Sequence, residues 1–262
     1  MLVDSHCHLD PTYLHGGPSD VLNRAKAAGV GTFVCIGVGR DLGAARAAVA
    51  LARQRDDVFA TVGVHPHDAA TMDEKGFEEI AALARDPRVV AIGEIGLDYH
   101  YDHSPRDVQQ AVFRRMIALA RDVKKPIVIH TRSAPADTLD ILAAENARDV
   151  GGIIHCFSED RAFAERALPL DFDLSFSGIL TFKNAHGIRD AARYAPVDRI
   201  MVETDSPFLA PVPMRGKPCE PAYIVHTARC LAELRGETFE AVAAQTTKNA
   251  ASRLRLTLPE KA

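Results

Sequence analysis

The stretch Leu2-Val3-Asp4-Ser5-His6-Cys7-His8 begins as an apolar strand and ends on two histidines separated by one residue. Side chains two residues apart on a strand point to the same face of the sheet. His6 and His8 can therefore bind one metal ion together. Such a pair is weak evidence by itself, because a single histidine at a strand end is usually a packing residue.

Four further candidate ligands stand at or near the ends of later apolar runs. These are Glu94, His130, His155 and Asp205. In a (β/α)8 barrel the carboxyl ends of all the strands surround one site. Because five separate strand ends supply a histidine or a carboxylate, the pattern predicts one shared metal centre rather than five unrelated packing residues.

Apolar runs recur along the chain at the intervals of a parallel barrel. Predicted strands cover residues 2–6, 32–36, 59–64, 89–94, 126–130, 151–155, 171–176 and 199–204. Helical periodicity lies between them, for example over 42–55 and 107–123, and two more helices are predicted over 220–234 and 239–254, the second capped by Thr238. We therefore predict an α/β fold, a TIM (β/α)8 barrel that forms a single domain over residues 1–262.

Composition excludes several other classes of protein. The chain has 262 residues, of which 47% are hydrophobic and 25% charged, and no apolar run reaches the roughly 18 residues of a membrane span. The first strand starts at once, without a secretory signal, and the five cysteines are scattered, as in a reducing compartment. We expect a cytoplasmic protein without a membrane partner or an obligatory protein partner.

The net charge of −4 argues against a protein that coats nucleic acid through phosphate contacts. It leaves open an enzyme that takes a strand end into a local pocket. Three cations are suited to binding phosphate oxygens at the predicted top face: Arg132, Lys183 and, in a proline-rich loop, Arg215. Four aromatic residues near the opening are candidates for base stacking or for core packing, of which core packing is favoured: Tyr99, Phe157, Phe182 and Phe208.

Four histidines and two carboxylates are too many ligands for one catalytic ion, which typically takes three and keeps a position for water. We therefore predict two divalent ions. His6, His8 and Asp205 are assigned to one ion, His130 and His155 to the other, and Glu94 to both. Asp205 has a second predicted role, in orienting the water and accepting its proton. Mixed nitrogen and oxygen ligands suit Zn²⁺, Mn²⁺, Ni²⁺ or, more weakly, Mg²⁺.

Seven motifs, in order along nearly the whole chain, resemble those of TatD-type metal-dependent deoxyribonucleases: DSHCHLD (4–10), GVHPH (63–67), GEIGLDY (93–99), HCFS (155–158), TFKNA (181–185), ETDSP (203–207) and EPAY (220–223). The resemblance implies a two-metal barrel that cleaves DNA phosphodiester bonds, commonly from a 3′ end, with the same six ligands. It also implies that His65 lines the pocket near the scissile phosphate. Cys219 and Glu159 depart from the family pattern, which bears on substrate preference.

Two other functions stay open from the sequence alone. The same barrel and ligand pattern serves hydrolases of amides, lactones and phosphotriesters. Many such relatives bridge their metals with a modified lysine on the fourth strand, where this chain has Glu94. A hydrolase of aminoacyl-tRNA esters or of small phosphodiesters passes that test. A non-catalytic metal-binding scaffold is the least favoured function, because it predicts the loss of at least one ligand.

Overall fold

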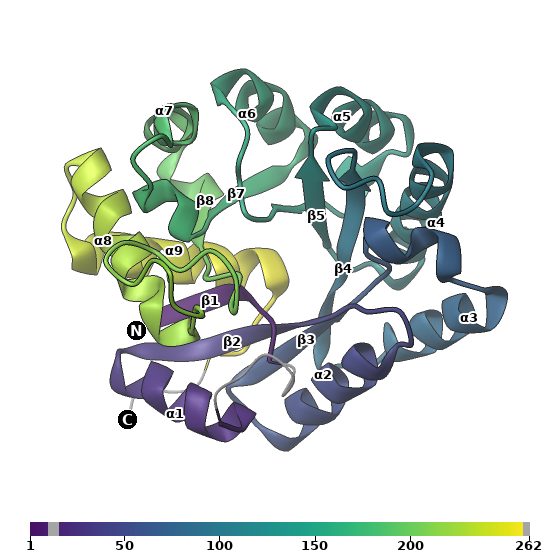
Figure 1. Ribbon diagram of the computed structural model, residues 1–262, viewed down its shortest axis with the longest axis horizontal. Coiled ribbons are helices and arrows are strands. Elements are labelled where there is room, and N and C mark those ends of the chain that lie inside the picture. Colours follow the sequence, from purple (N-terminus) through teal and green to yellow (C-terminus); the bar gives the residue numbers. More distant parts are fainter. Residues whose placement is uncertain (10–15, 259–262) are drawn as a thin grey trace.

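The computed structural model describes residues 1–9 and 16–258. Asp10, which ends the first motif, therefore lies outside the described residues. Eight strands form one parallel sheet in sequence order: β1 (Leu2–Cys7), β2 (Val30–Gly37), β3 (Val58–Val62), β4 (Val89–Asp98), β5 (Ile127–Arg132), β6 (Gly152–Ile154), β7 (Phe172–Phe176) and β8 (Ile200–Val202). The sheet curls into a barrel surrounded by helices (Figure 1), which confirms the predicted TIM (β/α)8 fold.

The barrel closes between its first and last strands. The amide of Asp205 donates to the carbonyl of His6 at 2.9 Å, and the amide of His8 donates to the carbonyl of Ser206 at 2.8 Å. Both hydrogen bonds lie at the carboxyl ends of the strands. The backbone that closes the barrel is therefore the same backbone that carries three of the candidate ligands.

Helices alternate with the strands around the barrel: α1 (Pro18–Ala27), α2 (Gly43–Gln54), α3 (Glu74–Leu83), α4 (Arg106–Val123), α5 (Pro135–Ala144), α6 (Arg161–Ala167), α7 (His186–Tyr194) and α8 (Ile224–Arg235). A short 3-10 helix, η6 (Pro221–Tyr223), precedes α8 where the sequence predicted one continuous helix from residue 220. Pro221 begins this turn, at a position where no intrahelical bond requires its missing amide hydrogen.

The last helix, α9 (Phe239–Leu254), begins where predicted, with the Thr238 hydroxyl accepting from the Ala241 amide. Alternate strand residues divide the core into two clusters. Outward residues such as Phe33 pack under the helices, whereas inward residues of seven strands, such as Val34 and Met201, join α9 through Leu254. Helix α9 therefore covers the end of the barrel opposite the carboxyl ends of the strands.

Strands β4 and β5 both run past their predicted carboxyl ends. Strand β4 continues past Glu94 to Asp98, so Glu94 lies inside a strand and not at its end, contrary to the prediction. Strand β5 likewise continues past His130 to Arg132, and the two extensions pair with each other. Gly96 makes this pairing possible, since its φ is 139° and a Cβ there would lie 2.0 Å from the His130 carbonyl oxygen.

Candidate metal centre

The first group of ligand candidates gathers where the barrel closes. His6 lies on β1 and His8 follows it, while Asp205 follows β8. The Nε2 atoms of both histidines are 3.6 Å from Oδ1 of Asp205. One ligand atom from each residue lies within 4.8 Å of the other two. These are the three residues that the sequence assigned to one ion.

A second group surrounds Glu94 on β4. Glu94 Oε1 is 2.8 Å from Nδ1 of His130, 2.9 Å from Nε2 of His155 and 3.5 Å from Nε2 of His65. Its other oxygen, Oε2, is 3.5 Å from Nε2 of His6. The two oxygens of Glu94 therefore face different histidine groups, as a bridging carboxylate would.

Burial by itself would raise the pKa of Glu94, but His155, His65 and the hydrogen bond from His130 outweigh it and hold that pKa well below its usual value. Burial by itself would also raise the pKa of Asp205. The hydrogen bond from His8 and the charges of the nearby histidines outweigh burial and lower that pKa. Both carboxylates are therefore ionised at neutral pH. The site has the negative charge that a divalent cation requires.

Two of the histidines, His6 and His65, are held in the neutral form. Burial lowers the pKa of His6 and lowers that of His65 to about 4, so both rings are neutral. Neutral imidazole is the form that binds metal. His6 is fully buried, and neither of its ring nitrogens has a hydrogen-bond partner. Buried polar nitrogens are rarely left unpaired, so the donor set around His6 fits a metal ion.

Two carboxylates that the sequence analysis did not assign stand behind the histidines. Glu203 Oε1 is 3.1 Å from Nδ1 of His155 and also accepts from the Cys156 amide at 2.7 Å. Asp98 Oδ2 is 3.1 Å from Nε2 of His130. Carboxylates in this position fix the orientation and tautomer of a metal-binding histidine.

The spacing along the chain could have identified both. Glu203 precedes Asp205 by two residues and Asp98 follows Glu94 by four, so each lies in the same short motif as a chosen ligand. Asp98 Oδ2 also lies 2.9 Å from Nε2 of His67. This contact places His67, the last residue of the GVHPH motif, beside the centre.

The four substrate-contact candidates lie in different places. His65 contacts Glu94, as described. Arg132 is exposed at the end of β5, with its guanidinium 4.6 Å from the ring centroid of Tyr101. Lys183 is exposed beyond β7, next to Phe182, and the guanidinium of Arg215 lies 3.9 Å from the Phe182 ring centroid. Lys183 and Arg215 thus belong to the β7–β8 side of the barrel mouth, and Arg132 to the β5 side.

The aromatic candidates differ as well. Phe157 is fully buried and packs against Phe163 and Phe176, so it is a core residue. The Tyr99 hydroxyl donates to Asp137 at 2.7 Å. Phe208 is 49% exposed, and its ring centroid is 5.9 Å from that of His8.

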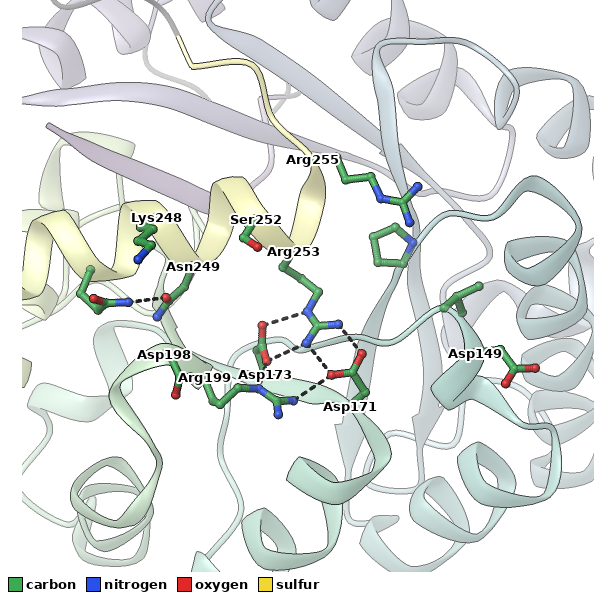
Figure 2. A pocket seen from close by; sticks show the side chains of 13 residues that line it. Asp149, Asp171, Asp173, Asp198, Arg199, Lys248, Asn249, Ser252, Arg253 and Arg255 are labelled. Atoms are coloured by element: carbon green, nitrogen blue, oxygen red, sulfur yellow. Dashed lines mark hydrogen bonds and ion pairs between the residues drawn. The ribbon is translucent and has the colours of Figure 1, made fainter.

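A cavity of about 600 Å³ lies at the opposite end of the barrel (Figure 2). It is lined by residues at or near the starts of β5, β6, β7 and β8 and by residues of α9 and its end. Arg253 of α9 donates to Asp171 at 2.8 Å and to Asp173 at 2.9 Å, and Arg199 contacts both aspartates (Figure 2). Four of the charged residues that line the cavity are thus paired with one another, which assigns these four to the attachment of α9: Asp171, Asp173, Arg199 and Arg253.

No helix within residues 1–9 and 16–258 combines the length and the apolar character that crossing a membrane requires.

Comparison with known proteins identifies the family. The family model described as TatD related DNase matches residues 3–255. The metal-dependent hydrolase YcfH of Escherichia coli (strain K12) is 47% identical over 95% of this chain and 93% of its own. The 3′-5′ ssDNA/RNA exonuclease TatD of Klebsiella pneumoniae (strain 342) is 33% identical over 88% of this chain and 89% of its own.

A solved structure agrees with these sequence matches. The crystal structure of YjjV, a TatD homolog from Escherichia coli K12, has a TM-score of 0.89 and 28% identity, with 98% of each chain covered. The fold, the donor set at the barrel mouth and the family model over residues 3–255 all agree. The chain belongs to the family of TatD-related DNases and is a metal-dependent hydrolase of that family.

Proposed function

We propose that this protein hydrolyses phosphodiester bonds at DNA strand ends, from the 3′ end, with two divalent metal ions. The Klebsiella pneumoniae relative, a 3′-5′ ssDNA/RNA exonuclease by name, supports a nucleic-acid substrate. The family model supports DNA. The ions are of the kind that mixed imidazole and carboxylate ligands suit, namely Zn²⁺, Mn²⁺, Mg²⁺ or Ni²⁺.

The observation that carries the proposal is the position of Glu94 between two groups of histidines. Its Oε2 faces His6, whereas its Oε1 faces His130 and His155. We assign His6, His8 and Asp205 to one ion, His130 and His155 to the second, and Glu94 to both. When bound, such a pair of ions polarises a phosphodiester and supplies a water nucleophile at neutral pH.

Asp205 is the proposed proton acceptor. Its side chain is 13% exposed, and its lowered pKa keeps it ionised at neutral pH. An ionised carboxylate at the barrel mouth can orient a water molecule and take its proton. His65, neutral because burial lowers its pKa to about 4, is proposed to contact the substrate beside Glu94. Arg132, Lys183 and Arg215 are proposed to bind phosphate oxygens.

We further propose that residues 1–262 act as one catalytic domain in the cytoplasm, without an obligatory protein partner. Five cysteines, each a free thiol, support a reducing compartment: Cys7, Cys35, Cys156, Cys219 and Cys230.

The test is cleavage of single-stranded DNA labelled at either end. The protein is stripped of metal, reloaded with Mg²⁺, Mn²⁺ or Zn²⁺, and compared with the Asp205→Asn variant. Metal-dependent shortening from the 3′ end, slowed at least about 100-fold in Asp205→Asn, is expected for loss of a general base. Asp140→Asn, which changes an exposed carboxylate on α5, is the control and retains activity.

Failure to cleave DNA with any ion, by protein that still binds metal, would contradict the proposal. Small esters, amides and aminoacyl-tRNA would then be the substrates to examine.

A further inference from the structure

Two exposed aromatic rings stand on opposite sides of the metal centre. Among the described residues, the exposed large hydrophobic side chains include Tyr101, at 51%, and Phe208, at 49%. Tyr101 follows β4 and Phe208 follows β8. In a barrel of eight strands in sequence order, β4 and β8 face each other across the mouth, as Figure 1 shows.

Phe208 lies against the first group of ligand candidates. Its amide donates to the carbonyl of Asp205 at 2.8 Å. Its ring meets the His8 ring edge to face, with centroids 5.9 Å apart and an interplanar angle of 79°. The cations Arg215 and Lys217 follow in the same loop, and both are exposed.

Tyr101 lies beside the second group. Its ring centroid is 5.5 Å from that of His67, and His67 shares the Asp98 carboxylate with His130. The ring of His103 stacks alongside Tyr101, with centroids 5.5 Å apart and an interplanar angle of 7°. The guanidinium of Arg132 lies 4.6 Å from the Tyr101 centroid. This side of the mouth therefore has a cation over an exposed ring, whereas on the Phe208 side the guanidinium of Arg215 lies over the Phe182 ring.

We infer that Tyr101 and Phe208 stack the bases on the two sides of the phosphate that is cut, so that the enzyme selects strands whose terminal bases are unpaired. The inference rests on the proposed function. Nonspecific single-strand sites combine aromatic rings, which accept the face of any base, with cations along the backbone. A base inside a duplex is stacked on its neighbours and must be extruded first, at a cost in free energy. Two rings on opposite sides of the centre suit two consecutive splayed nucleotides.

The test combines ring removal with base removal. Cleavage of a single-stranded oligonucleotide is measured for the wild type, Tyr101→Ala, Phe208→Ala and the control Tyr194→Ala. Tyr194 is 39% exposed at the end of α7, and the Arg161 guanidinium lies over its ring just as Arg132 lies over Tyr101. Each variant is also assayed on the same oligonucleotide with abasic sites at its two terminal nucleotides, and on a blunt duplex.

Loss of one stacked base weakens binding roughly tenfold. We expect Tyr101→Ala and Phe208→Ala to raise KM by about that factor, while Tyr194→Ala does not. On the abasic oligonucleotide, which lacks both bases, the wild type should lose both factors, about 100-fold in total, and each variant should lose only the tenfold factor of the ring that it retains. The preference of the wild type for single strands over blunt duplex should shrink in both variants.

Equal KM values for all four proteins on the intact oligonucleotide would overturn the inference while leaving the proposed function in place. An undiminished effect of ring removal on the abasic substrate would also overturn it, because the rings would then act on something other than bases. A wild-type protein that cleaves no nucleic acid overturns both proposals. Melting temperatures of the four proteins separate these results from misfolding.

Discussion

Glu203 stands behind His155, and only one of its two carboxylate oxygens has a partner. Oε1 binds the His155 ring and the Cys156 amide, while Oε2 is buried without a hydrogen bond. A carboxylate placed there strengthens the imidazole as a metal ligand and holds its orientation. Glu203 is therefore a positioning residue, although it touches neither ion in the proposed assignment.

Replacing the Glu203 carboxylate by an amide should weaken metal binding without removing a ligand. We expect Glu203→Gln to lower metal affinity by about 10–100-fold, the usual cost of losing such a partner. Competition with a chromophoric chelator measures the affinity. If Glu203 only positions His155, kcat should return toward the wild-type value at saturating metal. Unchanged affinity would refute the role.

Among single residues, the sequence predicts those ligands whose positions follow from the alternation of side chains along a strand. His6 and His8 are recognisable because they share a strand face, and the structure places them around Asp205. Tyr101 could not be recognised in the same way. Its proposed role in base stacking depends on the side of the barrel mouth toward which the loop after β4 turns. Residue spacing does not determine that side.

A cluster of charged residues holds helix α9 to strand β7, whereas the other strands contact α9 through apolar residues. One inward residue of β7 is Asp173, 3% exposed; it pairs with Ile153 of β6, which in turn pairs with Val128 of β5. Arg253 reaches Asp173 from α9 (Figure 2). The strand positions were predictable from periodicity. This attachment was not, because it joins residues 80 positions apart.

Removing this arginine should destabilise the fold. Truncating one partner of a buried ion pair leaves the other charge without compensation, and we expect Arg253→Met to lower the free energy of unfolding by about 3 kcal/mol. Urea unfolding measures it. The control is Arg85→Met, since Arg85 and Asp122 form a pair in which both side chains are 62% exposed, and its change should stay within about 1 kcal/mol. Similar changes for both variants would contradict the assignment.

Acid should weaken the same attachment. The hydrogen bond from Arg253 lowers the pKa of Asp171, although burial opposes it. A carboxyl group whose pKa is lower in the folded state contributes stability above its unfolded pKa, about 4, and loses that contribution as pH falls through the folded value. We expect the free energy of unfolding to fall below about pH 4, and to fall less steeply in Asp171→Asn. Urea unfolding at pH 7, 5 and 3 measures this, and parallel profiles would contradict it.

For the whole molecule, metal binding should contribute to stability. The fully buried His6 ring has no hydrogen-bond partner, and ionised carboxylates surround it. Each ion present at 100 times its Kd would add about 2.7 kcal/mol, or roughly 5–10 °C in Tm for a chain of this size. Chelation should lower Tm by at least that amount, and reloading should restore it. If the Tm of the wild type changes neither on chelation nor on reloading, the result would contradict the metal centre.

The hydrogen bonds that close the barrel join parts of the chain that are made at very different times. Asp4 and Thr204, which are hydrogen-bonded beside the centre, are 200 positions apart. At roughly 5–20 residues per second, a ribosome needs about 10–40 s to pass from one to the other. During that interval His6 and His8 have no Asp205 to join. A chain released before Asp205 is made therefore has no assembled site, and the capacity for hydrolysis arises only after that residue has been added.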